Sequence, residues 1–149
     1  MSLHLQMTWC LPRRPATVTM ARHLLDSALT LFGVSASCRD EIAIIVTEAC
    51  TNAVRHAAGE DYEVRFFADR NRCVIEVVDS GPGLDGEHLD GAALVPDDVT
   101  AERGRGLLII RAYSDELRLH QRDRSGLTVR VSKNLTWEAD PFALAPNLA

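Results

Sequence analysis

Two runs of alternating apolar and polar residues, only four residues apart, limit the fold more than any other feature of this 149-residue sequence. The first run places Tyr62, Val64, Phe66 and Ala68 at alternate positions, and the second run, CVIEVVD, occupies 73–79. A period of two residues is typical of a strand with one buried face. A connection as short as DRNR joins antiparallel neighbours, because parallel strands need a much longer crossover. The sequence therefore predicts an antiparallel hairpin that must bury one face.

The segments on either side of this hairpin predict the rest of the sheet and its helices. Alternation at 3–9 indicates a strand, and helical spacing indicates helices over 16–32, from about Ser37 to about Ala57, and near 106–114. Pro15 is expected to open the first helix, Gly33 to end it, and Ser37 to cap the second. Strands near 116–122 and 127–133 flank a hairpin turn, RDRSG.

This order of elements, β-α-α-β-β-loop-α-β-β, predicts a two-layer α/β sandwich. The sheet is expected to be mixed and mostly antiparallel, with the three helices on one face. We expect a single domain over 1–134 and a loosely ordered C-terminal tail over 135–149, where Pro and Ala are frequent.

Composition narrows the class of protein. Hydrophobic residues make up 46% of the chain and charged residues 25%, as in ordinary soluble globular domains, and the formal net charge is −5. No basic block stands out, which argues against direct nucleic-acid binding. No apolar run approaches the ~18 residues of a membrane span, and the N-terminus lacks a secretory signal pattern. The four cysteines form no C-x-x-C pair, so free thiols in a reducing cytoplasm are expected.

The segment VTEACTNAVRHA, 46–57, contains the first candidate site. At about 100° per residue, Glu48 and Asn52 lie one turn apart on a face away from the apolar stripe of the same helix. An asparagine carbonyl is a hard oxygen ligand suited to Mg²⁺, and a carboxylate one turn earlier could deprotonate a nucleophile beside it. An amphipathic helix with a solvated polar face is the competing explanation, and the segment taken alone favours it.

A second candidate lies at the end of the second predicted strand. Asp79 shares a face with two apolar residues, so its carboxylate would be buried and would need a partner such as an exocyclic amine. Gly81 and Gly83, in SGPG, permit close approach of a flat ligand. A plain turn after a strand would look the same.

A third candidate, ERGRGLLII, places Gly104 and Gly106 where a loop is expected to become a helix. The start of a helix can bind phosphate, and Arg105 adds positive charge there. This is not a P-loop, because the sequence contains no G-x-x-x-x-G-K-[ST] motif. Residues 84–103, a stretch of about 20 without periodicity, predict a mobile lid over the ligand.

Together, Glu48-x-x-x-Asn52-x-x-x-His56, Asp79-x-Gly81-x-Gly83 and Gly104-Arg105-Gly106-Leu107 form a recognisable pattern. The sequence resembles the GHKL (Bergerat-fold) ATPases and, within them, the anti-sigma-factor serine/threonine kinases of the RsbW/SpoIIAB type. The resemblance runs from about Leu3 to Lys133 and rests on TEACTNAVRHA, DSGPGL and GRGLLIIRAYSDEL.

The resemblance implies a Bergerat fold, ATP and Mg²⁺ as cofactors, and a role for each matching residue. Asn52 would coordinate Mg²⁺, Glu48 would be the general base, and Asp79 would bind the adenine amino group. The residues that would contact the rest of the nucleotide are Gly81 and Gly83 beside the base, Gly104 and Gly106 at the phosphates, and Arg105 near the γ-phosphate. Arg55 and His56 would only support the site.

The resemblance also implies partners in bacterial transcription regulation. The protein would hold a sigma factor inactive, phosphorylate a STAS-domain anti-anti-sigma factor, and form a homodimer. A non-catalytic ATP-binding module that acts by partner exchange is one alternative, and a histidine-kinase catalytic domain without its other parts is a second. Glu48 favours the kinase, because binding alone needs no base at that position.

Overall fold

A computed structural model describes residues 4–56, 59–79, 101–121 and 126–138 of the chain. Across these residues the elements follow the predicted order. The strands are β1 (Leu5–Pro12), β2 (Asp61–Ala68), β3 (Arg72–Asp79), β4 (Glu116–Gln121) and β5 (Leu127–Asn134), and the helices are α1 (Pro15–Phe32), α2 (Ala36–His56) and α3 (Ala101–Tyr113).

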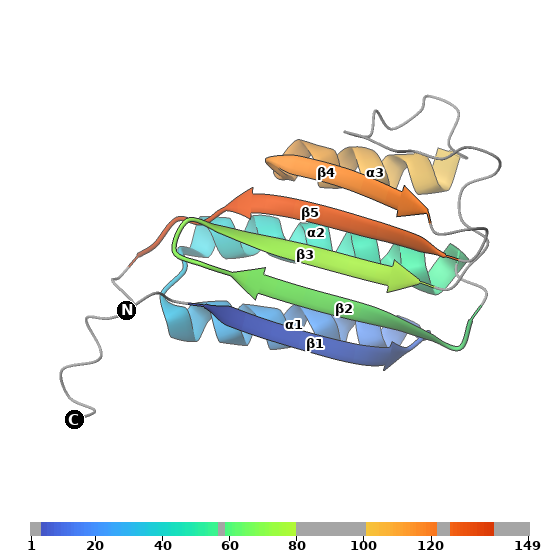
Figure 1. Ribbon diagram of the computed structural model, residues 1–149, viewed down its shortest axis with the longest axis horizontal. Helices are drawn as coiled ribbons and strands as arrows, with labels where there is room; N and C mark the ends of the chain where they lie inside the picture. Colours follow the sequence, from blue (N-terminus) through green and yellow to red (C-terminus); the bar gives the residue numbers. More distant parts are fainter. Residues whose placement is uncertain (1–3, 57–58, 80–100, 122–125, 139–149) are drawn as a thin grey trace.

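The strands form one sheet in the order β1-β2-β3-β5-β4, and every pair of neighbours is antiparallel. All three helices lie on the same face of this sheet, with α2 between α1 and α3 (Figure 1). The predicted two-layer α/β sandwich, with its mostly antiparallel sheet and its helices on one face, is therefore confirmed.

The core lies between the sheet and the three helices, and the predicted alternation decides which strand side chains enter it. In β2, the alternate residues Tyr62, Val64, Phe66 and Ala68 are buried, as predicted. Their register partners in β3 are Asp79, Val77, Ile75 and Cys73, which are buried as well. From the helical layer, α2 supplies Ile42, Ile45, Val46, Ala49 and Ala53 to the same core. Asp79 is the single charged side chain among these strand positions.

The ends of α1 are as predicted, but the start of α2 is not. Pro15 opens α1, and Gly33 ends it in the left-handed conformation at φ 83°. Ser37 lies inside α2 and does not cap it, because the helix begins one residue earlier, at Ala36. Ser35 takes the capping role, since its Oγ accepts a hydrogen bond from the Cys38 amide at 3.3 Å.

The third helix begins at Ala101 and not near 106, so Gly104 and Gly106 lie inside α3. The expectation was wrong because glycine disfavours helix interiors by about 1 kcal/mol, which made the two glycines look like loop residues. A tertiary contact of Gly106, described below, explains why the residue is tolerated there.

Residues 135–138 are held against the domain, which differs from the loosely ordered tail expected from 135 onward. Leu135 is buried, Trp137 Nε1 donates to the Arg70 carbonyl at 2.9 Å, and a Glu138 carboxylate oxygen accepts the Ala36 amide at 2.8 Å. The indole and the carboxylate supply partners that the Pro and Ala content of the segment does not reveal. Residues 139–149 lie outside the described part. Within that part, no helix is long and apolar enough to cross a membrane.

Candidate functional site

Three segments that carry the predicted site residues come together at one end of the molecule. The C-terminal half of α2, the end of β3 and the beginning of α3 all lie on the right in Figure 1. The antiparallel arrangement of β3 and β5 also brings the start of β5 to this end. The fold therefore gathers motifs that are more than 50 residues apart in the sequence, from Glu48 to Gly106.

Glu48, Asn52 and Gly106 meet where α2 packs against α3. A Cβ atom placed on Gly106 would lie 3.2 Å from Asn52 Oδ1, 3.2 Å from Glu48 Oε2 and 3.3 Å from Asn52 Nδ2. These separations are shorter than ordinary van der Waals contact, at about 3.5–4.0 Å. Only glycine lets α3 approach both polar side chains this closely, which accounts for a glycine in the interior of a helix.

Asn52 is buried, with 8% of its surface exposed, and its Nδ2 forms no hydrogen bond with any described residue. A solvated polar face, which the helix segment alone favoured, is thus wrong for Asn52. A buried polar group without a partner costs about 1–3 kcal/mol, and such groups in native proteins usually have a reason. The amide is suited to a ligand that offers an acceptor to Nδ2 and a cation or donor to Oδ1.

Asp79 is buried at the end of β3, and it shares the inner face with Ile75 and Val77 as predicted. Its Oδ1 accepts the backbone N–H of Leu127, the first residue of β5, at 3.3 Å. This bond contributes to compensating the burial of the carboxylate. The sequence predicted the burial of Asp79, whereas the donor from β5 requires knowledge of the strand order.

For the remaining predicted site residues, the structure gives only their exposure or does not describe them. Arg105 is exposed on α3, Arg55 is exposed at the end of α2, and His56 next to it is half-buried. Gly104 is buried inside α3. Gly81 and Gly83, together with most of the predicted lid, lie outside the described residues, so their roles stay predictions.

Tyr62 and its neighbours are residues of this region that the sequence did not single out. The Tyr62 hydroxyl lies 2.8 Å from Thr17 Oγ1, and Cys50 of α2 is buried in the same core. Burial raises the pKa of Cys50 and the pKa of Tyr62, each to about 12. The pairing of β2 with β3 would have indicated this position, because Tyr62 lies directly opposite Asp79.

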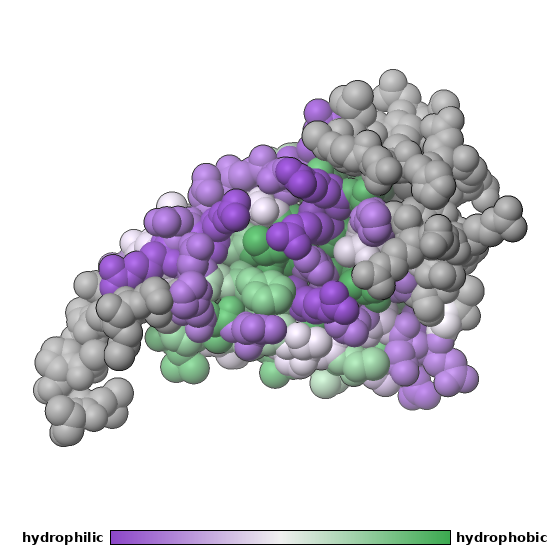
Figure 2. Space-filling model, in the orientation of Figure 1, coloured by the Kyte–Doolittle hydropathy of each residue, from purple (hydrophilic) through white to green (hydrophobic). Residues whose placement is uncertain are grey.

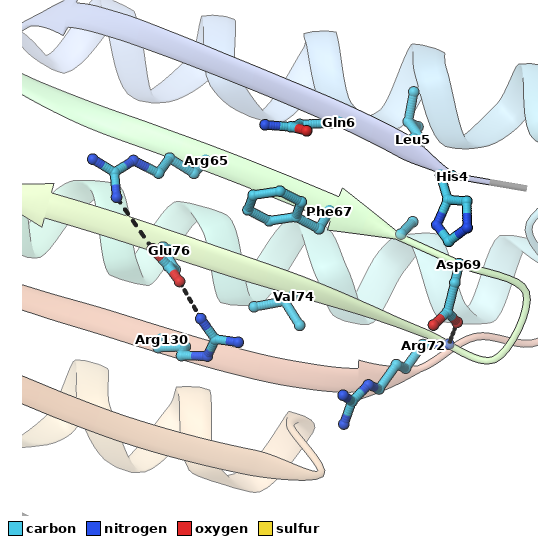
Figure 3. Close-up of a pocket in the computed structure, with 11 residues that line it drawn as sticks. His4, Leu5, Gln6, Arg65, Phe67, Asp69, Arg72, Val74, Glu76 and Arg130 are labelled. Atoms are coloured by element: carbon cyan, nitrogen blue, oxygen red, sulfur yellow. Dashed lines mark hydrogen bonds and ion pairs between the residues drawn. The ribbon is translucent and has the colours of Figure 1, made fainter.

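A separate hollow of about 600 Å³ lies on the opposite, helix-free face of the sheet. Figure 2 shows apolar side chains in the middle of this face with hydrophilic ones around them. Arg65 and Arg130 both point toward Glu76 and form ion pairs with it, beside the half-exposed ring of Phe67 (Figure 3). The sheet separates this hollow from Glu48 and Asn52, so it is not part of the candidate site.

Comparison with known proteins agrees with this arrangement. A family model described as the histidine kinase-like ATPase domain matches residues 11–133. The serine-protein kinase RsbW of Bacillus subtilis (strain 168) is 32% identical over 136 residues, covering 85% of this chain and 84% of that protein. The serine-protein kinase RsbW of Bacillus licheniformis is 35% identical over 137 residues, covering 85% and 84%.

A solved structure shares the fold at lower sequence similarity. The crystal structure of the RsbU and RsbW domains of Rv1364c from Mycobacterium tuberculosis superposes with a TM-score of 0.67 at 18% identity. The match covers 91% of this chain but 34% of that longer chain. The family match and the curated relatives lead to one conclusion: the chain belongs to the histidine kinase-like ATPase domain family and is a relative of the RsbW serine-protein kinases.

Proposed function

We propose that this protein is an ATP-dependent serine/threonine kinase and anti-sigma factor that phosphorylates a STAS-domain anti-anti-sigma factor. One observation supports the proposal most: the buried amide of Asn52 has no partner among the described residues and lies beside Glu48, where Gly106 leaves room. A structural site would satisfy this amide internally, whereas a ligand-binding site leaves it for the ligand.

The side chains present suit a nucleotide with its divalent cation. A phosphate oxygen can accept from Asn52 Nδ2, while the Oδ1 atom is a hard oxygen ligand of the kind Mg²⁺ takes. We therefore assign Asn52 to both the nucleotide and Mg²⁺. When bound, the cation supplies neutralisation of the phosphate charge. The other assigned contacts are Asp79 with the adenine amino group, Gly81 and Gly83 beside the base, and Gly104, Arg105 and Gly106 at the phosphates.

Glu48 is the catalytic base of this proposal. The substrate serine oxygen attacks the γ-phosphorus, the bond from that phosphorus to the β,γ-bridging oxygen breaks, and ADP leaves. The serine proton passes to the Glu48 carboxylate. The position of Glu48 supports this role, because its Oε2 and the Asn52 amide both lie next to Gly106 of α3. A site for binding alone would gain nothing from a negative charge next to phosphates.

Family membership also supports a proposal for the partners. The relatives are named serine-protein kinases, which supports a protein substrate with a hydroxyl group. We assign the sigma factor and the STAS-domain protein as alternating partners, a homodimer as the working form, and the cytoplasm as the compartment. A non-catalytic ATP-binding module is the second candidate, and Glu48 distinguishes the two.

Phosphoryl transfer tests the proposal directly. Wild-type protein, labelled ATP and Mg²⁺ are incubated with candidate STAS proteins, and Glu48→Ala is compared with Asp40→Ala as a matched control. Asp40 is an exposed carboxylate on the same helix, two turns before Glu48. Loss of a general base typically lowers the rate about 10²- to 10⁴-fold, so Glu48→Ala should be nearly inactive while Asp40→Ala stays active.

The outcomes separate the two candidates. Undiminished transfer by Glu48→Ala would remove the base assignment. ATP binding without any transfer in the wild type would favour the non-catalytic module. No ATP binding by the wild type in calorimetry would remove both.

A further inference from the structure

Tyr62 is the cross-strand neighbour of Asp79. The two residues are direct partners in the antiparallel β2–β3 pair, so their side chains leave the same face of the sheet. The Cβ atoms of such partners lie about 4.5–5.5 Å apart, and both side chains are buried. Asp79 is thus bordered by Tyr62 on the β2 side and by the Leu127 amide on the β5 side.

The Tyr62 hydroxyl belongs to a hydrogen-bonded chain whose direction can be deduced. Thr17 Oγ1 lies 2.8 Å from the carbonyl oxygens of both Pro12 and Arg14, which only accept, so its single proton goes to one of them. Thr17 Oγ1 must then accept the Tyr62 proton at 2.8 Å.

This chain ties the phenol ring to α1. Thr17 lies in the first turn of α1, and Cys50 lies in α2 between Glu48 and Asn52 in sequence. Burial raises the pKa of both the Cys50 thiol and the Tyr62 phenol to about 12, so both groups keep their protons at physiological pH. The Tyr62 proton is directed to Thr17, so the side of Tyr62 that borders its cross-strand partner Asp79 is the ring and not the hydroxyl proton.

We propose that Tyr62 is a positioning residue, which holds the Asp79 carboxylate in the orientation that distinguishes the amino group of a bound adenine. This inference rests on the proposed role of Asp79 in nucleotide binding. It adds that the precision of base recognition depends on the buried aromatic ring beside Asp79, and less on the hydroxyl bond that ties this ring to α1. Tyr62 itself is assigned no contact with the nucleotide.

The test measures discrimination between ATP and purine riboside triphosphate, which lacks the exocyclic amino group. A hydrogen bond to a charged carboxylate should make the wild type prefer ATP by about tenfold to hundredfold in Kd. Tyr62→Leu removes the ring, and we expect the Kd ratio to fall about fivefold, a typical coupling between neighbouring residues. Tyr62→Phe keeps the ring and should retain the ratio within about twofold.

Two further variants separate positioning from general destabilisation. Phe66→Leu makes a similar change on the same strand and face, but Phe66 lies opposite Ile75 and not Asp79. It should lower thermal stability like Tyr62→Leu and leave the Kd ratio unchanged. In the Asp79→Asn background, Tyr62→Leu should cause no additional loss of discrimination. Tyr62→Met replaces Tyr62→Leu if the latter does not fold.

Each result bears on a distinct claim. The inference is overturned if Tyr62→Leu, or Tyr62→Met in its place, weakens both triphosphates equally, or if Phe66→Leu lowers the ratio as much. A wild-type protein that binds ATP without preferring it over purine riboside triphosphate would instead refute the proposed role of Asp79.

Discussion

The substitution Gly106→Ala tests the geometry of the site with the smallest possible change, one methyl group. The new Cβ would lie 3.2–3.3 Å from three polar atoms of Glu48 and Asn52. These side chains, or α3 itself, must then move by a few tenths of an ångström. Overpacking of this kind costs about 1–3 kcal/mol. Replacing glycine by alanine inside a helix, in contrast, raises the free energy of unfolding by about 1 kcal/mol.

The gain in helix propensity offsets part of the clash in stability, but it does not restore the geometry of the site. We expect the free energy of unfolding to fall by about 0–2 kcal/mol, because the clash exceeds the gain in helix propensity. Displacement of reacting groups by about 1 Å can cost 10²-fold in rate, so a shift of a few tenths of an ångström should lower phosphoryl transfer by about threefold to tenfold. Most of this loss should persist at temperatures where the variant is fully folded.

Chemical denaturation and a phosphoryl-transfer assay, run on the same preparations, check both expectations. Ala112→Gly is the control, since Ala112 is exposed on the same helix. It should lose about 1 kcal/mol of stability and no activity. If Gly106→Ala transfers phosphate as fast as the wild type, the contact between Gly106, Glu48 and Asn52 does not limit the reaction, and the geometric reasoning fails.

Two other predictions concern Asn52 and the buried thiols. Asn52→Ala should abolish Mg²⁺-dependent ATP binding in calorimetry. The free energy of unfolding should change by no more than ~1 kcal/mol, because the variant also removes an unpaired buried amide. An unchanged Mg²⁺ dependence would contradict the ligand role. Burial raises the pKa values of Cys50 and Cys73 from 9.0 to about 12. Between these two pH values the unfolded chain loses thiol protons that the folded protein keeps. The free energy of unfolding should therefore be highest below pH 9 and fall as the pH rises toward 12. Each thiol contributes at most ~1.4 kcal/mol per pH unit, and Cys73→Ala should reduce the slope in urea titrations at pH 8–11.

The fold was predictable wherever the hydrophobic period was regular. The alternation from Tyr62 to Ala68 fixed both the strand and its buried face, and the short connections fixed the antiparallel pairing. Predictions failed where a tertiary contact outweighed local preference. Ser35 caps α2 in place of Ser37, and its own amide is bonded to the Thr136 carbonyl at 2.8 Å, about 100 residues later in the chain. Gly106 lies within α3 for a reason visible only once α2 and α3 are packed.

The site was predictable in its residues and not in its environment. The spacing of Glu48 and Asn52 placed them on one face of a helix, but the burial of Asn52 and the partial burial of Glu48 depend on α3, more than 40 residues further along the chain. Asp79 was expected to be buried, yet its donor, Leu127, comes from a strand that joins β3 only through the sheet order. Tyr62 looked like an ordinary core residue because its hydroxyl partner, Thr17, lies on α1, 45 residues earlier in the chain.

The strongest reason to regard this region as functional is that three unfavourable features coincide at one contact. A glycine inside α3 weakens the helix by about 1 kcal/mol, the unpaired amide of Asn52 costs about 1–3 kcal/mol, and Glu48 places a carboxylate beside it. Selection for stability alone would favour apolar side chains of matching volume at these positions. Sequences that otherwise agree with their fold depart from local rules mainly at functional sites. A ligand that supplies acceptors to Asn52 and a proton to Glu48 would account for all three departures together, and a nucleotide with a substrate hydroxyl is such a ligand.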